Sequence, residues 1–164
     1  MRWMVLQLSL VFIGSVWVTA QAQDRPFRLG PTEQQLLEAA NAARSKEKIG
    51  QLVVNRTLTE IARKHAENMA RQEKMEHVLD GKGVAARAEE GGYRYRVIGE
   101  NLAQAIGDKD APAPSASVIH QHWMESKPNR INLLNPKFQE VGIAVVKSPK
   151  GTYFYCQVLA APQK

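Results

Sequence analysis

The sequence predicts an α+β domain in which helices pack on an antiparallel sheet. Helical periodicity dominates the first half of the chain, alternating strand patterns dominate its C-terminal part, and the middle mixes the two. The chain has 164 residues, which is the length of one ordinary domain. We therefore expect a single domain over residues 32–162, and the sequence contains no internal repeat.

Two stretches in the first half have the pattern of amphipathic helices. A capping-box pattern that begins at Thr32 precedes an apolar stripe, which predicts a first helix over residues 32–46. A second capping-box pattern begins at Thr57. The stripe that follows it consists of Leu58, Ile61, Ala62, His65 and Met69. Because His65 belongs to this stripe, we interpret it as a core histidine rather than a ligand.

The middle of the chain alternates short helices and strands. Residues 81–93 predict a short helix between glycine-rich breaks. Aromatic and aliphatic residues alternate with arginines over residues 93–97, which predicts a short strand with one apolar face. Residues 107–116 are predicted as a loop. A further helix is expected from Ser115, with Trp123 on its apolar stripe.

The C-terminal part predicts a β-hairpin. The strands VGIAVV and TYFYCQVLA flank the turn SPKG, which favours antiparallel pairing. Cys156 shares a strand face with Phe154 and Val158, so we interpret it as a buried thiol. It is the only cysteine, which excludes a disulfide within the chain.

Residues 1–22 have the pattern of a secretory signal peptide. Arg2 precedes an apolar run that ends in the triplet Ala20, Gln21 and Ala22, which is typical of a cleavage site. The alternative is an uncleaved anchor, since the run approaches the length of a bilayer span. We expect cleavage, an N-terminal arm over residues 23–31, no stable membrane insertion afterwards, and an exported protein that is periplasmic or secreted.

Charge and motif content exclude several functions. The formal net charge is +6, and the basic residues are scattered among acidic ones. This pattern indicates a solvated surface or weak attraction to anionic envelope surfaces, and no motif supports nucleic-acid binding. The zinc motif HExxH, the nucleophile elbow GxSxG, the Walker loop and GxGxxG are all absent.

Few ionisable residues remain as candidates for a functional site. His77 follows the second predicted helix where the apolar period has ended, which suits either a cleft or a plain surface position. Glu100, in the segment GENLAQA, follows a predicted strand end and must be solvated, hydrogen-bonded or paired. His120 and His122 diverge around a helix, which is poor geometry for joint metal ligation.

Four segments together resemble one protein family. They are HAENMARQEKMEH, RAEEGGYRYRVIGENLA, WMESKPNRINLLNPKFQEVGIAVV and GTYFYCQVLA. Their order is similar to the CAP superfamily, also called the SCP domain, which includes cysteine-rich secretory proteins, venom allergens and plant pathogenesis-related proteins. The resemblance places the chain in a bacterial exported branch. It implies a three-layer α-β-α sandwich with a central antiparallel sheet.

The resemblance also implies a reduced version of the family's cleft. Many animal and plant members hold two histidines and two glutamates there, sometimes with a divalent metal. His77 matches the first histidine and Glu100 the first glutamate. Ser126 stands where the second glutamate would be, Phe154 where the second histidine would be, and Asn129 where bacterial relatives often carry a histidine. We therefore expect no cofactor, with zinc at His77 and Glu100 as the alternative.

These observations predict a non-enzymatic binding module with a central cleft. The resemblance implies a lipidic ligand, a cell-envelope component or a protein partner. The expected cleft residues are His77, Glu100, Asn101, Ser126, Asn129 and Arg130. The first alternative is a weak hydrolase or protease, in which Glu100 orients His77 as a general base, with or without a metal. The second alternative is an envelope protein that binds through its basic surface.

Overall fold

The computed structural model describes residues 27–106 and 114–163, arranged as five helices and four strands. The expected signal peptide, the start of the arm and most of the loop over residues 107–116 lie outside these ranges. The elements are α1 (Pro31–Lys46), β1 (Val53–Val54), α2 (Arg56–Gln72), α3 (Val84–Glu90), β2 (Tyr95–Ala105), α4 (Ala116–Glu125), α5 (Lys127–Leu133), β3 (Glu140–Lys147) and β4 (Tyr153–Pro162).

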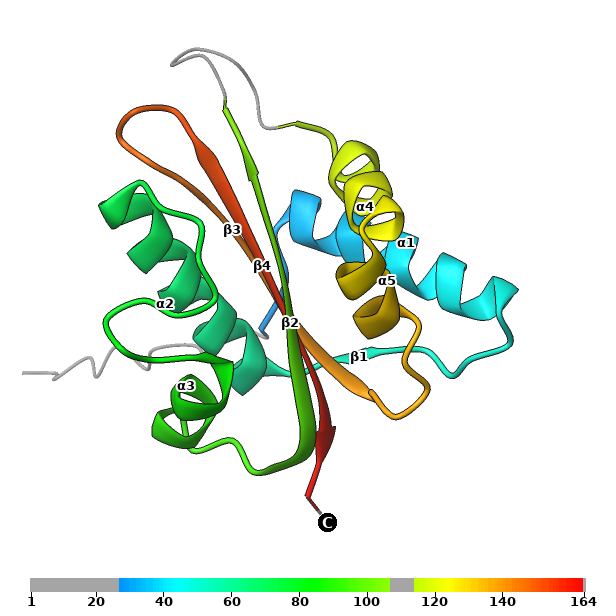
Figure 1. The fold of residues 1–164 in the computed structure, drawn as a ribbon. Helices are drawn as coiled ribbons and strands as arrows, with labels where there is room; N and C mark the ends of the chain where they lie inside the picture. Colours follow the sequence, from blue (N-terminus) through cyan, green and yellow to red (C-terminus); the bar gives the residue numbers. More distant parts are fainter. Residues whose placement is uncertain (1–26, 107–113, 164) are drawn as a thin grey trace, which may run out of the picture.

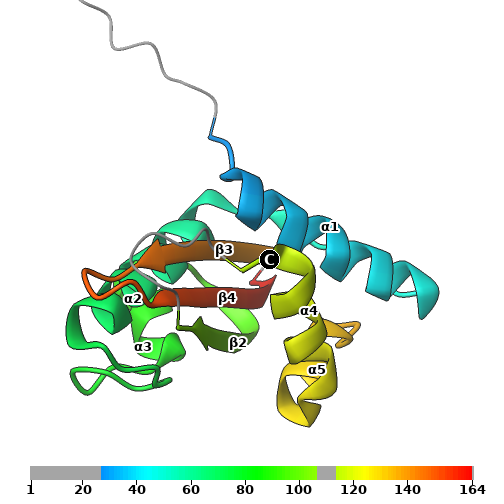
Figure 2. The ribbon, with the colours of Figure 1, turned by 90° about the horizontal axis from the view of Figure 1, so that it is seen from above.

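The strands form one sheet in the order β1-β3-β4-β2. The pairs β3–β4 and β2–β4 are antiparallel, whereas the two-residue strand β1 runs parallel to β3. Helices α2 and α3 cover one face, and α1, α4 and α5 cover the other (Figures 1 and 2). The structure confirms the predicted α+β sandwich, with one short parallel strand added to the expected antiparallel sheet. Among the described residues, no helix has the length and apolar character required to cross a bilayer.

Both helix starts differ from the capping-box predictions. The N-cap of α1 is Gly30, which makes no side-chain cap, so Thr32 lies within the first turn. The N-cap of α2 is Asn55, whose Oδ1 accepts a hydrogen bond from the Leu58 amide at 3.1 Å. Asn55 satisfies one of the open amides of the first turn. The capping role predicted for Thr57 was therefore wrong, while the helix itself is confirmed.

The predicted strand over residues 93–97 overlaps the beginning of a longer one, which starts at Tyr95. Strand β2 extends to Ala105 and stays paired with β4 through Glu100 opposite Val158 and Asn101 opposite Gln157. The prediction that Glu100 follows a strand end was therefore wrong, since it lies in the middle of a strand. The predicted single apolar face was also wrong, because the pairing is irregular between Tyr95 and Val97 and these residues pack in different clusters.

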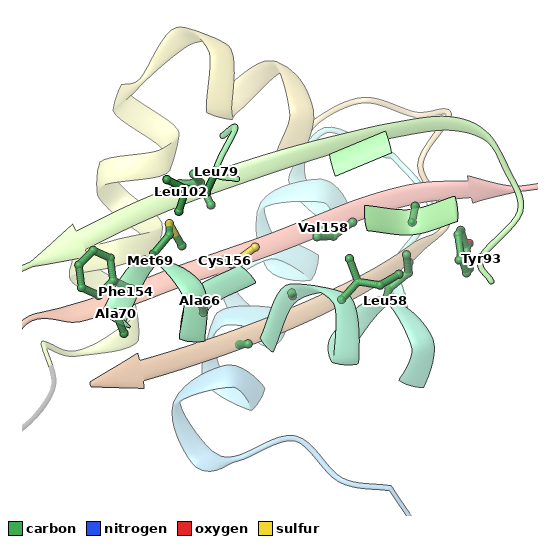
Figure 3. Packing of buried hydrophobic residues seen from close by; sticks show 14 of the residues in the cluster. Leu58, Ala66, Met69, Ala70, Leu79, Tyr93, Leu102, Phe154, Cys156 and Val158 are labelled. Carbon is green, nitrogen blue, oxygen red and sulfur yellow. The ribbon is translucent and has the colours of Figure 1, made fainter. Parts of the chain in front are cut away.

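Two hydrophobic clusters bind the helices to the sheet. On the α2 side, Leu58, Ala62, Ala66 and Met69 pack against the strand residues Leu102, Phe154, Cys156 and Val158 (Figure 3). On the other side, the cluster contains Leu36 of α1, Trp123 of α4 and Leu133 of α5, with Tyr155 and Leu159 of β4. The predicted burial of Cys156 with Phe154 and Val158 is confirmed. Because both faces of β4 are covered, polar side chains on the sheet must find partners inside the protein.

Candidate functional site

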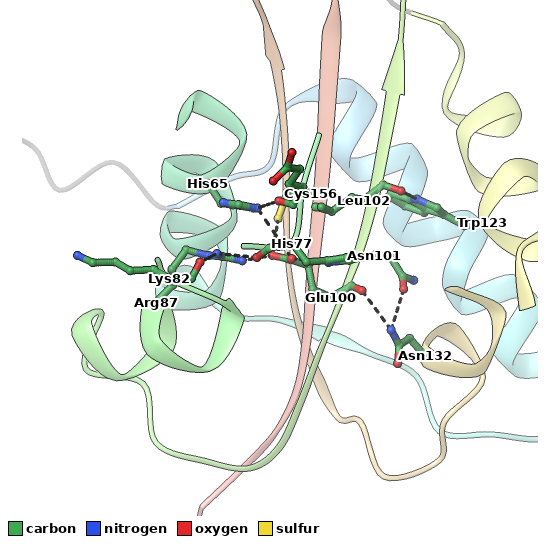
Figure 4. A network of polar contacts seen from close by, with 11 residues as sticks. His65, His77, Lys82, Arg87, Glu100, Asn101, Leu102, Trp123, Asn132 and Cys156 are labelled. Carbon is green, nitrogen blue, oxygen red and sulfur yellow. Dashed lines mark hydrogen bonds and ion pairs between the residues drawn. The ribbon is translucent and has the colours of Figure 1, made fainter. Parts of the chain in front are cut away.

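Glu100 and Asn101 occupy adjacent positions of β2 and therefore point to opposite faces of the sheet. Glu100 points toward α2 and α3, whereas Asn101 points toward α5 (Figure 4). Both are buried. The segment GENLA thus contributes one polar side chain to each side of the central layer.

On the first face, Glu100 is surrounded by cations and donors. Its Oε1 lies 2.8 Å from His77 Nδ1 and 3.9 Å from His65 Nε2. Its Oε2 accepts from Arg87 Nη2 at 2.5 Å and from Cys156 Sγ at 3.5 Å. We call His65, His77, Arg87, Glu100 and Cys156 the Glu100 cluster. Only 2% of the Glu100 side chain is exposed, so these neighbours, rather than water, must stabilise its negative charge.

Arg87 links the Glu100 cluster to the segment that precedes α3. Besides its contact with Glu100, its Nη1 donates to the carbonyl of His77 at 3.1 Å and to that of Lys82 at 2.6 Å. The guanidinium therefore joins a strand, a helix and a loop with one planar set of donors. This arrangement holds His77 against Glu100.

The charges of the cluster shift several pKa values. Burial disfavours the charged form of Glu100, but the His77 hydrogen bond and the charges of Arg87 and His65 outweigh it, so the Glu100 pKa is lowered. The hydrogen bond to Glu100 raises the pKa of His77. Burial lowers the pKa of His65. Burial, followed by the Glu100 charge, raises the pKa of Cys156 well above its usual value, so its thiol stays protonated at neutral pH.

On the opposite face, Asn101 belongs to an amide network. Its Nδ2 donates to Gln157 Oε1 at 3.0 Å and to the carbonyl of Asn129 at 3.2 Å. Asn132 Nδ2 in turn donates to Asn101 Oδ1 at 2.9 Å and to the Glu100 carbonyl at 3.2 Å. These contacts attach α5 to the middle of the sheet.

The six residues predicted to line one cleft are therefore distributed over both faces. Glu100 contacts His77 on one side, while Asn101 contacts the Asn129 carbonyl on the other. Ser126 joins α4 to α5, and Arg130 is exposed on α5. The expected contact between His77 and Glu100 is present, and the binding roles of all six residues stay predictions.

Sequence reasoning missed three polar residues that complete these two networks. Arg87 was predicted only as part of a short helix, although it is the cation closest to Glu100. Asn132 lies on α5, a helix that was not predicted. Gln157 was visible as a polar residue within an apolar strand, and its strand face could have identified it as a partner for β2 or α5.

Two grooves lie near these networks. A groove of about 690 Å³ runs between α2 and α3, and His65 and Arg87 are among its lining residues. The other lining side chains include acidic and basic groups of both helices. A second groove, of about 540 Å³, lies along α5. Its lining residues are Met124, Glu125, Lys127, Arg130, Ile131, Leu134, Asn135 and Pro136.

The Glu100 cluster does not fit a divalent metal in its present arrangement. Among the described residues, no three or more His, Cys, Asp or Glu side chains are grouped to hold a metal ion. His77 and Arg87 already contact the two oxygens of Glu100, and His65 Nε2 lies 3.0 Å from the Glu76 carbonyl. Both Glu100 oxygens, His77 Nδ1 and His65 Nε2 are therefore already engaged within the protein.

The three layers and the two polar networks define a small α-β-α sandwich in which a buried glutamate of strand β2 contacts a histidine. The chain belongs to the CAP family, described as the cysteine-rich secretory protein family, whose sequence model matches residues 37–158. This match confirms the family resemblance inferred from the four sequence segments.

Individual relatives support the same assignment. The chain is 29% identical over 124 residues to the uncharacterized protein YkwD of Bacillus subtilis (strain 168), and the aligned region covers 75% of this chain and 46% of YkwD. The chain thus spans less than half the length of the curated relatives it matches.

Solved structures share the fold. An outer surface protein from Borrelia burgdorferi superposes with a TM-score of 0.71 at 17% identity, covering 79% of this chain and 92% of the Borrelia protein. An extracellular protein containing a SCP domain from Bacillus anthracis superposes with a TM-score of 0.68 at 23% identity, covering 82% of this chain and 44% of the Bacillus protein.

Proposed function

We propose that this CAP domain is an exported, non-enzymatic binding module that takes a lipidic ligand with an anionic head group in the groove along α5. The observation that supports this function is the make-up of that groove. Apolar side chains of Met124, Ile131, Leu134 and Pro136 line it, together with the cations Lys127 and Arg130, which outnumber the one acid, Glu125. Apolar surface beside a net positive charge is complementary to an amphiphile with a negative end.

Ile131 is the clearest contact point for such a ligand. Its exposed fraction is 58%, and it lies beside the other apolar side chains of the groove. Covering this surface with an alkyl chain would remove apolar area from water, which is the main favourable term in binding of this kind. Arg130, the adjacent residue, would contact the carboxylate or phosphate of the ligand.

The chemistry of the Glu100 cluster supports a role other than catalysis. Both oxygens of Glu100 already accept hydrogen bonds, from His77 and Arg87. The nearby thiol of Cys156 is fully buried and its pKa is raised, so it is a poor nucleophile. A cluster in which Glu100 is held by both His77 and Arg87 is suited to holding α3 and its loop on the sheet.

Export is supported by two independent observations. Residues 1–22 have the pattern of a signal peptide. Two of the structural neighbours are an extracellular protein and an outer surface protein. We propose that this chain acts outside the cytoplasm, in the periplasm or beyond.

The test compares an anionic lipid with an uncharged one of the same chain length. We expect oleate to bind the mature protein saturably in calorimetry and oleyl alcohol to bind less tightly. Ile131→Gln should weaken oleate binding by roughly fivefold, because about 1 kcal/mol of apolar contact is lost. The matched control is Val118→Gln, since Val118 is 57% exposed on α4 and lies outside the groove lining. Equal affinities for both variants, or no saturable oleate binding by the wild type, would overturn the proposal.

A hydrolase is the second candidate, and one observation favours it. The His77 side chain is 63% exposed while Glu100 contacts its Nδ1, which resembles a general base oriented by a carboxylate. Hydrolysis of ester and peptide substrates by wild type and His77→Ala would test this role. Equal turnover by the two proteins would exclude a catalytic role for His77.

A further inference from the structure

We propose that Arg87 is a built-in cation that takes the place of a divalent metal at Glu100, and that its removal opens a metal site formed by Glu100, His77 and His65. The Glu100 cluster lies on the opposite face of the sheet from the proposed lipid groove, so this role does not depend on lipid binding. Neither the sequence motifs nor the family match assigns Arg87 such a function.

The position of the guanidinium suits it to this replacement. Arg87 Nη2 lies 2.5 Å from Glu100 Oε2, and only 11% of the Arg87 side chain is exposed. The guanidinium is also fixed by the carbonyls of His77 and Lys82. One permanent positive charge therefore balances one buried carboxylate, and three acceptors hold it in place.

The charge of Arg87 also repels a metal ion. A divalent ion that approached Glu100 would lie beside the Arg87 charge in a region with little water, where like charges repel strongly. The ion would also have to displace the guanidinium from Oε2. The arginine thus excludes the metal by occupying a ligand atom and by its charge.

The donors that would remain without Arg87 are of the kind that binds zinc, and they would have to move closer together, because no three of the described residues are grouped for a metal in the present arrangement. Glu100 Oε1 lies 2.8 Å from His77 Nδ1 and 3.9 Å from His65 Nε2, so two imidazoles approach one carboxylate. Without Arg87, Oε2 would become available as well. Two imidazoles and one carboxylate form a three-ligand set found in zinc sites, with water as the fourth ligand. His65 would exchange its contact with the Glu76 carbonyl for the ion.

The experiment measures thermal unfolding of the mature protein near neutral pH with and without zinc. Arg87→Met removes the charge and keeps a long side chain. We expect zinc to leave the wild-type Tm unchanged and to raise that of Arg87→Met by several degrees, on the order of 5 °C at zinc well above Kd. The double variant Arg87→Met with Glu100→Gln should lose this rise. Arg96→Met is the matched control, because Arg96 is exposed and should show no zinc response.

A variant that preserves the charge shows whether zinc binding depends on loss of the Arg87 charge or only on a loosened fold. Arg87→Lys keeps a cation near Glu100 but cannot reproduce the three contacts of the guanidinium. We expect it to be destabilised and insensitive to zinc, and a zinc response as large as that of Arg87→Met would overturn the role of the charge.

Three other results would also overturn the proposal. The first is a zinc-dependent Tm rise in the wild type that Glu100→Gln abolishes. The second is no zinc response in folded Arg87→Met. The third applies if Arg87→Met does not fold alone: zinc should then restore its folded signal, and failure to do so counts against the proposal.

Discussion

Replacing Glu100 by glutamine tests whether a buried charge holds the α2–α3 side of the sheet together. Glutamine keeps the size and shape of the side chain and removes its charge. The Arg87 guanidinium, 11% exposed, would lose its counter-ion, and the new amide group would present a donor to either Arg87 or His77. The substitution therefore removes one half of a largely buried ion pair and leaves the other half in place.

The expected cost follows from that geometry. Breaking a buried ion pair by removing one partner costs about 3–5 kcal/mol, and the partial exposure of Arg87 favours the lower end. We expect Glu100→Gln to lower the free energy of unfolding by about 3 kcal/mol and Tm by roughly 10 °C. Urea unfolding followed by tryptophan fluorescence is a suitable assay, since Trp123 is fully buried.

A matched control separates this effect from a general loss of a glutamate. Glu60 pairs with Arg56 at 3.0 Å, but both side chains are more than half exposed. Glu60→Gln should therefore change stability by no more than about 0.5 kcal/mol. A loss below about 1 kcal/mol for Glu100→Gln would refute the reasoning, because it would mean that Arg87 is well solvated without its partner.

The wild type and Glu100→Gln should also differ in their response to pH. The folded-state pKa of Glu100 is lowered, so its contribution is complete above the unfolded value of about 4.3 and is lost as pH falls through the folded value. The folded-state pKa of His77 is raised, so its contribution is complete below about 6.5 and is lost as pH rises through the folded value. The stability advantage of the wild type should be largest between these limits. An advantage that stays constant into strong acid would contradict the assignment. Two further substitutions test the fold around the site. Arg44 is fully buried and donates to four backbone carbonyls. Arg44→Met should therefore lower the free energy of unfolding in urea by about 3 kcal/mol. The control Arg63→Met, at a half-exposed position, should lower it by less than about 1 kcal/mol. Similar losses in both variants would contradict the buried role. Gly142→Ala would place a Cβ in overlap with the backbone of Leu58, so we expect a cost of more than about 3 kcal/mol or no folded protein, and an unchanged Tm would disprove the close approach of α2 to β3.

Elements with a clear period could be predicted from the sequence. The apolar stripe of α2 repeats at helical spacing, and its members Leu58, Ile61, Ala62, His65 and Met69 are buried as expected. The alternation around Cys156 correctly predicted that Phe154, Cys156 and Val158 share a buried face, and the opposite face of β4 is buried as well. In α2 the burial has the same period as the sequence, and in β4 the alternation identified which side chains share a face, so local information was sufficient for both.

The parts that failed depend on contacts between distant residues. The segment GENLAQA contains glycine, asparagine and glutamine, which favour strands weakly, and it is a strand because it pairs with β4 along its length. The contact of Arg87 with Glu100 joins residues 13 positions apart on a helix and a strand. No local pattern encodes such a pair, so the Glu100 cluster could be predicted as a site only as far as His77 and Glu100, which the sequence singled out and the family resemblance paired.

The placement of Glu100 and Asn101 on opposite faces also specifies how β2 aligns with β4. Strand β2 is at the edge of the sheet, and the residues that follow, Leu102 and Ala103, are apolar and pack one on each side. A slip by one residue would move each of these apolar side chains to the other face of the sheet at modest cost. The same slip would put a carboxylate among the amides beneath α5 and leave Arg87 facing an uncharged asparagine. The two polar residues thus act as a register lock, which rejects the misaligned strand during folding whatever ligand the mature protein binds.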